Sequence, residues 1–142
     1  MRLYGFSAVV ISALCVAGCA STQSGSTNVP ANPNSKQFDA ASGKLTRIDM
    51  FSGVSPKCTE LPGMSATITK PPTQGVAKIV HTRDFSPFPP QDVASKCNKQ
   101  RVPVWVVQYQ SKPGYVGPDS FSYQKKFPDG DVIDATAVLN VH

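Results

Sequence analysis

The chain has 142 residues, and its 14 Lys and Arg residues against 9 Asp and Glu residues give a formal net charge of +5. A basic balance can favour anionic partners, but here the basic residues are scattered apart from Lys96/Lys99/Arg101 and Lys125/Lys126. Neither group is interleaved with aromatic residues, as a site for single-stranded nucleic acid would be. We therefore expect no nucleic-acid partner, and the length leaves room for one domain.

Residues 1–18 are predicted to be a secretory signal peptide. Arg2 precedes an apolar run from Leu3 to Ala17, and the run ends in small residues. A permanent membrane span needs roughly twenty apolar residues, so this run is short for one. A basic start, a short apolar centre and small residues at the end are typical of a cleaved signal. An uncleaved signal anchor is the alternative.

The end of the apolar run carries a more specific pattern, Val16-Ala17-Gly18-Cys19. It resembles the lipobox of bacterial lipoproteins, in which the cysteine is lipidated and the chain is cut just before it. The resemblance implies that Cys19 carries acyl chains such as palmitate, which anchor the protein in the membrane. Two or three such chains hold a protein firmly, because each buried methylene contributes about 0.8 kcal/mol. Ala20 stands where Asp would mark retention in the inner membrane, so the resemblance implies the outer membrane.

After Cys19 the sequence is rich in Ser, Gly, Asn and Pro and has little to bury. Such a composition is typical of a flexible tether. We therefore expect a linker over residues 19–43 and a folded domain over residues 44–142.

Two cysteines remain for the domain. Cys15 leaves with the signal peptide and Cys19 is consumed by lipid, which leaves Cys58 and Cys97. An even pair in an exported domain is normally a disulfide, and closely spaced partners for a zinc or redox site are missing. We therefore predict a Cys58–Cys97 disulfide.

The domain sequence favours strands. Short runs rich in Val, Ile, Thr and aromatic residues alternate with Pro, Gly and Asp clusters, as in all-β domains. We expect the last strand to turn Ala135, Ala137, Leu139 and Val141 inward. The expected strands are 45–50, 64–70, 76–82, 102–110, 120–127 and 132–141.

The run from Tyr115 to Tyr123, with Gly117, Asp119 and Phe121 between them, resembles a signature of bacterial Ig-like, cadherin-like repeats. With the strand spacing, it predicts an all-β, Ig-like, two-sheet antiparallel β-sandwich of about six to seven strands. The disulfide and the Phe/Pro-rich insertion at residues 83–101 depart from that family. The resemblance implies adhesion, spacing, or the binding of carbohydrate or protein at cell surfaces.

Four residues are candidate partner contacts. Phe85 and Phe88 lie in a proline-stiffened segment, which would lose little entropy on binding. The alternative is that these rings cap one end of the core beside the disulfide. Lys112 and Tyr115 lie on a predicted turn and are candidate loop contacts. Trp105 is expected in the core, packed near the disulfide as in Ig-type domains.

No residue pattern indicates catalysis, a metal or a cofactor. His81 and His142 are the only histidines, and no nucleophile-elbow motif accompanies them. Asp129, Asp131 and Asp134 could suggest calcium, but turn chemistry explains them and further oxygen ligands are missing. We therefore expect a non-catalytic protein without metal or cofactor.

These features predict a lipid-anchored cell-envelope protein whose Ig-like domain mediates binding or assembly with a protein or glycan partner. The alternative is a periplasmic inhibitor of a lysozyme-type hydrolase, because small disulfide-bonded β lipoproteins of that class have this size and placement. An inhibitor of that kind should present an exposed polar loop to the cleft of the enzyme.

Overall fold

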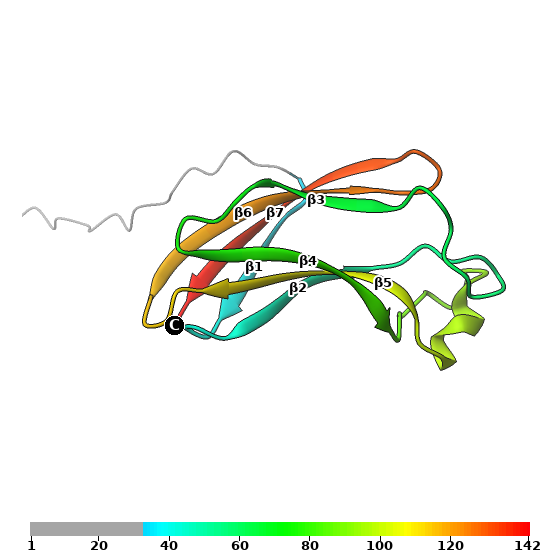
Figure 1. Cartoon of the computed structure of the whole chain (residues 1–142), viewed down its shortest axis with the longest axis horizontal. Helices are drawn as coiled ribbons and strands as arrows, with labels where there is room; N and C mark the ends of the chain where they lie inside the picture. The colour runs from blue at the N-terminus through cyan, green and yellow to red at the C-terminus, as the bar shows by residue number, and fades with distance from the viewer. Residues whose placement is uncertain (1–32) are drawn as a thin grey trace, which may run out of the picture.

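The computed structural model describes residues 33–142, so the predicted signal peptide and Cys19 lie outside the described residues. No helix within residues 33–142 combines the length and the apolar character needed to cross a membrane. The elements are β1 (Ser35–Ala40), β2 (Leu45–Phe51), β3 (Ser65–Lys70), β4 (Gly75–Asp84), the short 3-10 helix η1 (Ser95–Lys99), β5 (Val102–Ser111), β6 (Gly117–Lys126) and β7 (Val132–Val141) (Figure 1).

The strands form two sheets that pack as the layers of a sandwich, as predicted (Figure 1). One sheet has the strand order β1-β7-β6-β3, and the other has the order β2-β5-β4. All neighbouring pairs are antiparallel except β1 and β7, which run parallel. The expected two-sheet sandwich is therefore present, with antiparallel pairing everywhere except at the β1–β7 edge.

β1 lies inside the stretch that the composition predicted to be linker. Its residues pair with β7 in an unbroken register from Ser35↔Thr136 to Ala40↔Val141. Only Phe38 and Ala40 face the core, and the other side chains of the strand are exposed. The predicted linker boundary at residue 43 is thus wrong, because backbone pairing with a distant strand holds a segment whose own side chains bury little.

The main core lies between the two sheets. β6 and β7 alternate buried residues with half-buried or exposed ones, and Ala135, Ala137, Leu139 and Val141 face inward as expected. The rings of Tyr109 and Phe121, one from each sheet, stack with centroids 6.1 Å apart. The period of two read from the sequence therefore identified the buried face of β7 correctly.

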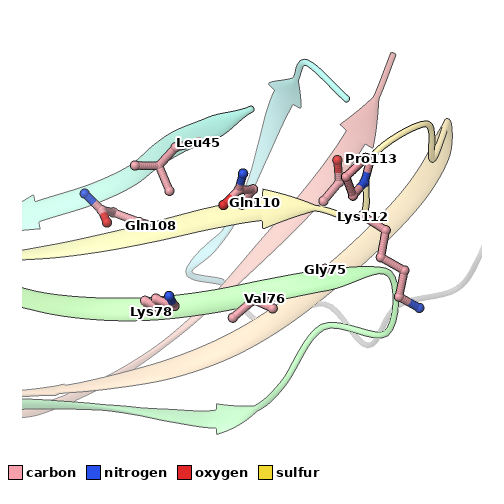
Figure 2. A pocket seen from close by; sticks show the side chains of 9 residues that line it. Leu45, Gly75, Val76, Lys78, Gln108, Gln110, Lys112 and Pro113 are labelled. Atoms are coloured by element: carbon pink, nitrogen blue, oxygen red, sulfur yellow. The ribbon is translucent and has the colours of Figure 1, made fainter. Parts of the chain in front are cut away.

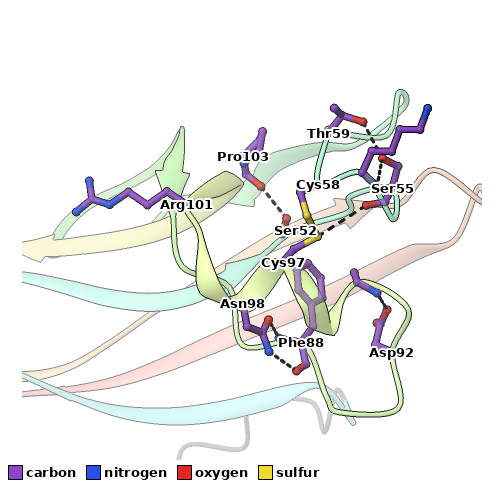
Figure 3. The surroundings of a disulfide bond; sticks show 12 residues. Ser52, Ser55, Cys58, Thr59, Phe88, Asp92, Cys97, Asn98, Arg101 and Pro103 are labelled. Atoms are coloured by element: carbon purple, nitrogen blue, oxygen red, sulfur yellow. Dashed lines mark hydrogen bonds between the residues drawn. A yellow bond between two sulfur atoms is a disulfide. The ribbon is translucent and has the colours of Figure 1, made fainter.

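A second, smaller core covers the opposite face of β5 at one end. Val102, Val104 and Val106 point away from the main core and are fully or almost fully buried beneath Val54, Ala94 and Cys97. The predicted disulfide is present: Cys58 and Cys97 are bonded with their Cα atoms 5.6 Å apart (Figure 3). The bond joins the β2–β3 connection to η1, and these two segments together cover this end of the sheet. We call them the disulfide-bonded roof.

Candidate functional site

The other end of the same sheet face has no such roof. There the outer surface of β2, β5 and β4 is hollowed into a depression of about 580 Å³, which we call the outer groove (Figure 2). It is lined by Leu45, Gly75, Val76, Lys78, Gln108, Gln110, Ser111, Lys112 and Pro113. The groove therefore continues the strand face on which Val102, Val104 and Val106 are buried.

Strand register sets these residues in rows across the sheet. Gln110 of the central strand pairs with Leu45 on one side and Val76 on the other. These two apolar residues are 59% and 55% exposed, so both present apolar surface to the solvent on either side of Gln110. The next row places Lys78 beside Gln108. An apolar row thus lies next to a polar row carrying a cation.

Close backbone packing shapes the end of the groove. A Cβ atom on Gly75 would lie 2.5 Å from the carbonyl oxygen of Gln110, so β4 can start here only with glycine. The N–H of Gly43 donates to Ser111 Oγ at 2.8 Å, and Gln110 Nε2 donates to the Gly43 carbonyl at 2.8 Å. These contacts hold the β1–β2 turn against the rim.

The groove is electropositive. Lys78 and Lys112 are the charged residues among those that line it, and none of the described residues that line it is acidic. Lys112 Nζ donates to the Thr73 carbonyl at 3.1 Å and to Gln74 Oε1 at 3.4 Å, both neutral acceptors. Its charge is therefore not cancelled by these contacts, and the groove favours an anionic group.

A buried carboxylate anchors the turn beside the groove. Asp119 on β6 accepts hydrogen bonds from the backbone N–H groups of Thr73 and Gln74, each at 3.0 Å. The hydroxyl of Tyr109 on β5 donates to it at 2.9 Å. Burial by itself would raise the pKa of Asp119, but the hydrogen bonds outweigh it and hold the pKa below the usual 3.8.

The four predicted contact residues do not form one site. Lys112 lines the outer groove, whereas the hydroxyl of nearby Tyr115 donates to the Pro118 carbonyl at 2.6 Å and its ring packs on the main core. At the far end, Phe85 is 51% exposed beneath the guanidinium of Arg101. Phe88 packs on the second core, which corresponds to the alternative that the sequence left open for it.

The groove residues other than Lys112 were missed. Gln108 and Gln110 alternate with buried residues in the most apolar strand of the chain, and that alternation was the available signal of an uncovered face. Leu45 and Val76 carried no such signal, because exposed and buried aliphatic residues look alike in a sequence.

Trp105 is not beside the disulfide, contrary to expectation. It is half-buried at the margin of the main core, whereas Cys97 belongs to the second core on the other face of β5. Its ring stacks on His81 with centroids 4.6 Å apart. Glu60 Oε1 accepts from Trp105 Nε1 at 3.3 Å and is paired with His81 Nε2 at 2.9 Å. These three side chains satisfy one another in a cleft of about 330 Å³.

Within residues 33–142, no three His, Cys, Asp or Glu side chains are grouped so that they could hold a metal ion. The aspartates weighed for calcium lie at the β6–β7 hairpin, where Asp129 Oδ1 accepts a hydrogen bond from the N–H of Asp131 at 3.1 Å. This contact is the turn chemistry expected of an Asp-Gly sequence.

No protein-family model matches the chain, and no curated protein matches it. Among solved structures, amebosin superposes with a TM-score of 0.45 and 11% identity over 78% of this chain and 93% of that one. An endo-fucoidan hydrolase from glycoside hydrolase family 107 superposes with a TM-score of 0.40 and 11% identity over 77% of this chain and 13% of the enzyme.

Proposed function

We propose that this protein is a lipid-anchored component of the bacterial cell envelope whose sandwich domain binds a partner at the outer groove without catalysing a reaction. The observation that carries the binding role is the groove itself, in which exposed Leu45 and Val76 lie beside amides and cations on a sheet face. The domain covers the other end of this face with a disulfide-bonded roof. The lipid anchor is inferred from the Val16–Cys19 pattern.

The direction of β1 supports this arrangement. Its end at Ala40 leads into the turn whose Gly43 contacts the groove, whereas Ser35 pairs further along β7 with Thr136. A strand of this length covers roughly 17 Å at 3.3 Å per residue. The described chain therefore enters the sandwich at the end of β1 that lies away from the groove.

The anchor is tested by intact mass spectrometry of the protein purified from membranes. We expect a chain that begins at Cys19 and carries a diacylglycerol and an acyl group. A Cys19→Ala variant should lose this mass and should not fractionate with membranes. A chain that still begins at Met1 and lacks lipid would overturn the envelope part of the proposal.

The binding role is tested by photo-crosslinking in the bacterium that makes the protein. A photo-reactive amino acid placed at Gln108 should give a discrete adduct, because that position lies within the groove. The matched control is the same amino acid at Lys126, an exposed residue at the end of β6 in the other sheet. Equal adducts from both positions, or none from Gln108, would contradict binding at the groove.

One observation favours the second candidate, an inhibitor of a lysozyme-type hydrolase. The disulfide holds η1 at the domain end, and Lys96 and Lys99 are exposed on it. Glycosidases carry paired carboxylates in their clefts, which a rigid cationic segment could approach. If this candidate is correct, the protein inhibits lysozyme in a turbidity assay, and the double variant Lys96→Glu/Lys99→Glu does not. The absence of inhibition would exclude it for the lysozyme tested.

A further inference from the structure

We infer that the outer groove takes an acidic peptide segment in an extended conformation, with acidic residues at two positions flanking an apolar one, spaced by single residues. This inference rests on the proposed function, because it names the ligand of the same site. It comes from the order of chemical groups along the groove.

Three consecutive rows present a cation, an apolar pair and a second cation. Gln108 and Gln110 share the outer face of β5 at a two-residue step of roughly 6.6 Å, and Lys112 follows just beyond the end of the strand, where its N–H donates to the Gln74 carbonyl at 2.8 Å. Lys112 stands at the first row, and Leu45 and Val76 flank the second. In the third row Lys78 lies across Gln108 from Arg47, whose guanidinium pairs with Asp84. An extended peptide repeats its side chains with the same period. Its residues i, i+2 and i+4 can therefore face these rows in turn.

Charge complementarity decides which residues suit the outer rows. Asp84, at the other end of β4, already pairs with Arg47 at 3.1 Å. Lys78 makes no ion pair within the described residues, and Lys112 contacts only neutral oxygens. Acidic side chains at i and i+4 would supply the missing partners, while an apolar residue at i+2 would cover Leu45 and Val76.

The two amides suit the backbone of such a peptide. A peptide that lies on the face of a sheet brings backbone N–H and C=O groups that need hydrogen-bond partners. A glutamine side chain offers both a donor and an acceptor. The side chain of Gln108 makes no hydrogen bond to another described residue, and Gln110 uses Nε2 for Gly43 while its Oε1 stays available. None of the described residues that line the groove is aromatic, so a sugar ring would find no aromatic surface among them to stack on.

The inference is tested by fluorescence anisotropy with labelled, end-blocked peptides. The first contains Glu-Ser-Leu-Ser-Glu, the second has the same composition in the order Glu-Glu-Leu-Ser-Ser, and the third replaces both Glu by Lys. We expect the first to bind most tightly and to weaken as salt is raised, because exposed charges are screened. Polygalacturonate is the competitor that represents a carboxylated glycan.

Variants locate the binding. Lys78→Glu and Val76→Asp should each weaken binding of the first peptide by about tenfold, which is about 1.4 kcal/mol. Lys126→Glu, with the same charge change in the other sheet, should leave it unchanged. All three positions are exposed, and unchanged thermal unfolding would show that each variant is folded.

Equal binding of the first two peptides, or no effect of Lys78→Glu, would overturn the inference. Binding of polygalacturonate without peptide binding would replace the peptide by an anionic glycan. If no peptide binds but the crosslink from Gln108 persists, the inference fails and the proposed function stands. If the crosslink is also absent, both fail.

Discussion

At the scale of single residues, Asp119 joins parts of the domain that are far apart in the sequence. It lies on β6, and its carboxylate reaches the β3–β4 turn at Thr73 and Gln74 and the Tyr109 hydroxyl in the opposite sheet. Asp119 is 7% exposed and Tyr109 is fully buried. The turn that it holds lies beside Lys112, so this carboxylate supports both the sandwich and one end of the outer groove.

Asp119→Ala is expected to lower the free energy of unfolding by about 3 kcal/mol, because it leaves buried donors without an acceptor. Urea unfolding at pH 7 measures the change. The control is Asp39→Ala, which removes an exposed carboxylate with a side-chain contact to Asn140 at 3.2 Å. A loss for Asp119→Ala no larger than that for Asp39→Ala would show that the network contributes little.

At the scale of elements, the disulfide end of the domain depends on a covalent bond. Val102, Val104 and Val106 are buried there by segments with little regular structure. Since the bond closes a separation of 39 residues, the chain-entropy model gives it about 4 kcal/mol of stabilisation.

The double variant Cys58→Ala/Cys97→Ala should therefore unfold with a free energy about 4 kcal/mol lower, measured in urea. Amide hydrogen exchange should accelerate most in residues 83–101, which include η1, because the disulfide holds this segment against the sheet. The β6–β7 hairpin, which is remote from the bond, is the internal reference. An equal acceleration of amide exchange in both regions would contradict the prediction that the disulfide stabilises its own end of the domain.

β1 provides a second prediction at this scale. A chain that begins at Lys44, the domain boundary expected from composition, lacks β1 and leaves the paired edge of β7 exposed. We expect it to be less stable than a chain that begins at residue 33 by about 2–3 kcal/mol, mainly from the loss of Phe38 and Ala40 from the core. Thermal unfolding of the two chains measures the difference. Equal stability would show that β1 is dispensable.

At the scale of the whole molecule, the two sheets are tied by two hydroxyl–carboxylate pairs, one buried and one half-buried. Tyr109 donates to Asp119 at 2.9 Å, and Tyr123 donates to Asp49 at 2.8 Å. Lys125 Nζ also contacts Asp49 at 3.0 Å. Burial, followed by the neighbouring carboxylates, raises the pKa of both tyrosines well above the usual 10.0.

These pKa shifts predict a loss of stability at both ends of the pH scale. Asp119 has a lowered pKa, so the unfolded chain takes up its proton first, and stability falls as the pH drops below about 5. The tyrosines have raised pKa values, so the unfolded chain releases their protons first, and stability falls as the pH rises above 10.

Urea unfolding between pH 3 and 11 measures both limbs of this profile. Asp119→Asn should flatten the acidic limb, and Tyr123→Phe should flatten the alkaline limb, because each removes one of the linked groups. An unchanged slope in either variant would mean that other groups dominate that limb.

Local sequence patterns were sufficient to predict much of the fold. The alternation of buried and exposed residues identified β7 and its inward face, and Pro128-Asp129-Gly130 marked the hairpin that joins it to β6. The disulfide followed from counting cysteines once Cys15 and Cys19 were assigned to the N-terminal region. These features depend on neighbours in the sequence or on residue type, so the sequence by itself determined them.

Only the tertiary structure decided the rest. β1 is a strand because β7 offers it hydrogen bonds, although four of its six side chains are polar. Gln108 is open to the groove while Val106, two residues earlier on the same face, is buried, because the disulfide-bonded roof ends between them. Such differences arise from contacts between segments far apart in the chain, and no local pattern contains them. The outer groove could therefore be found only once both sheets and the roof were in place.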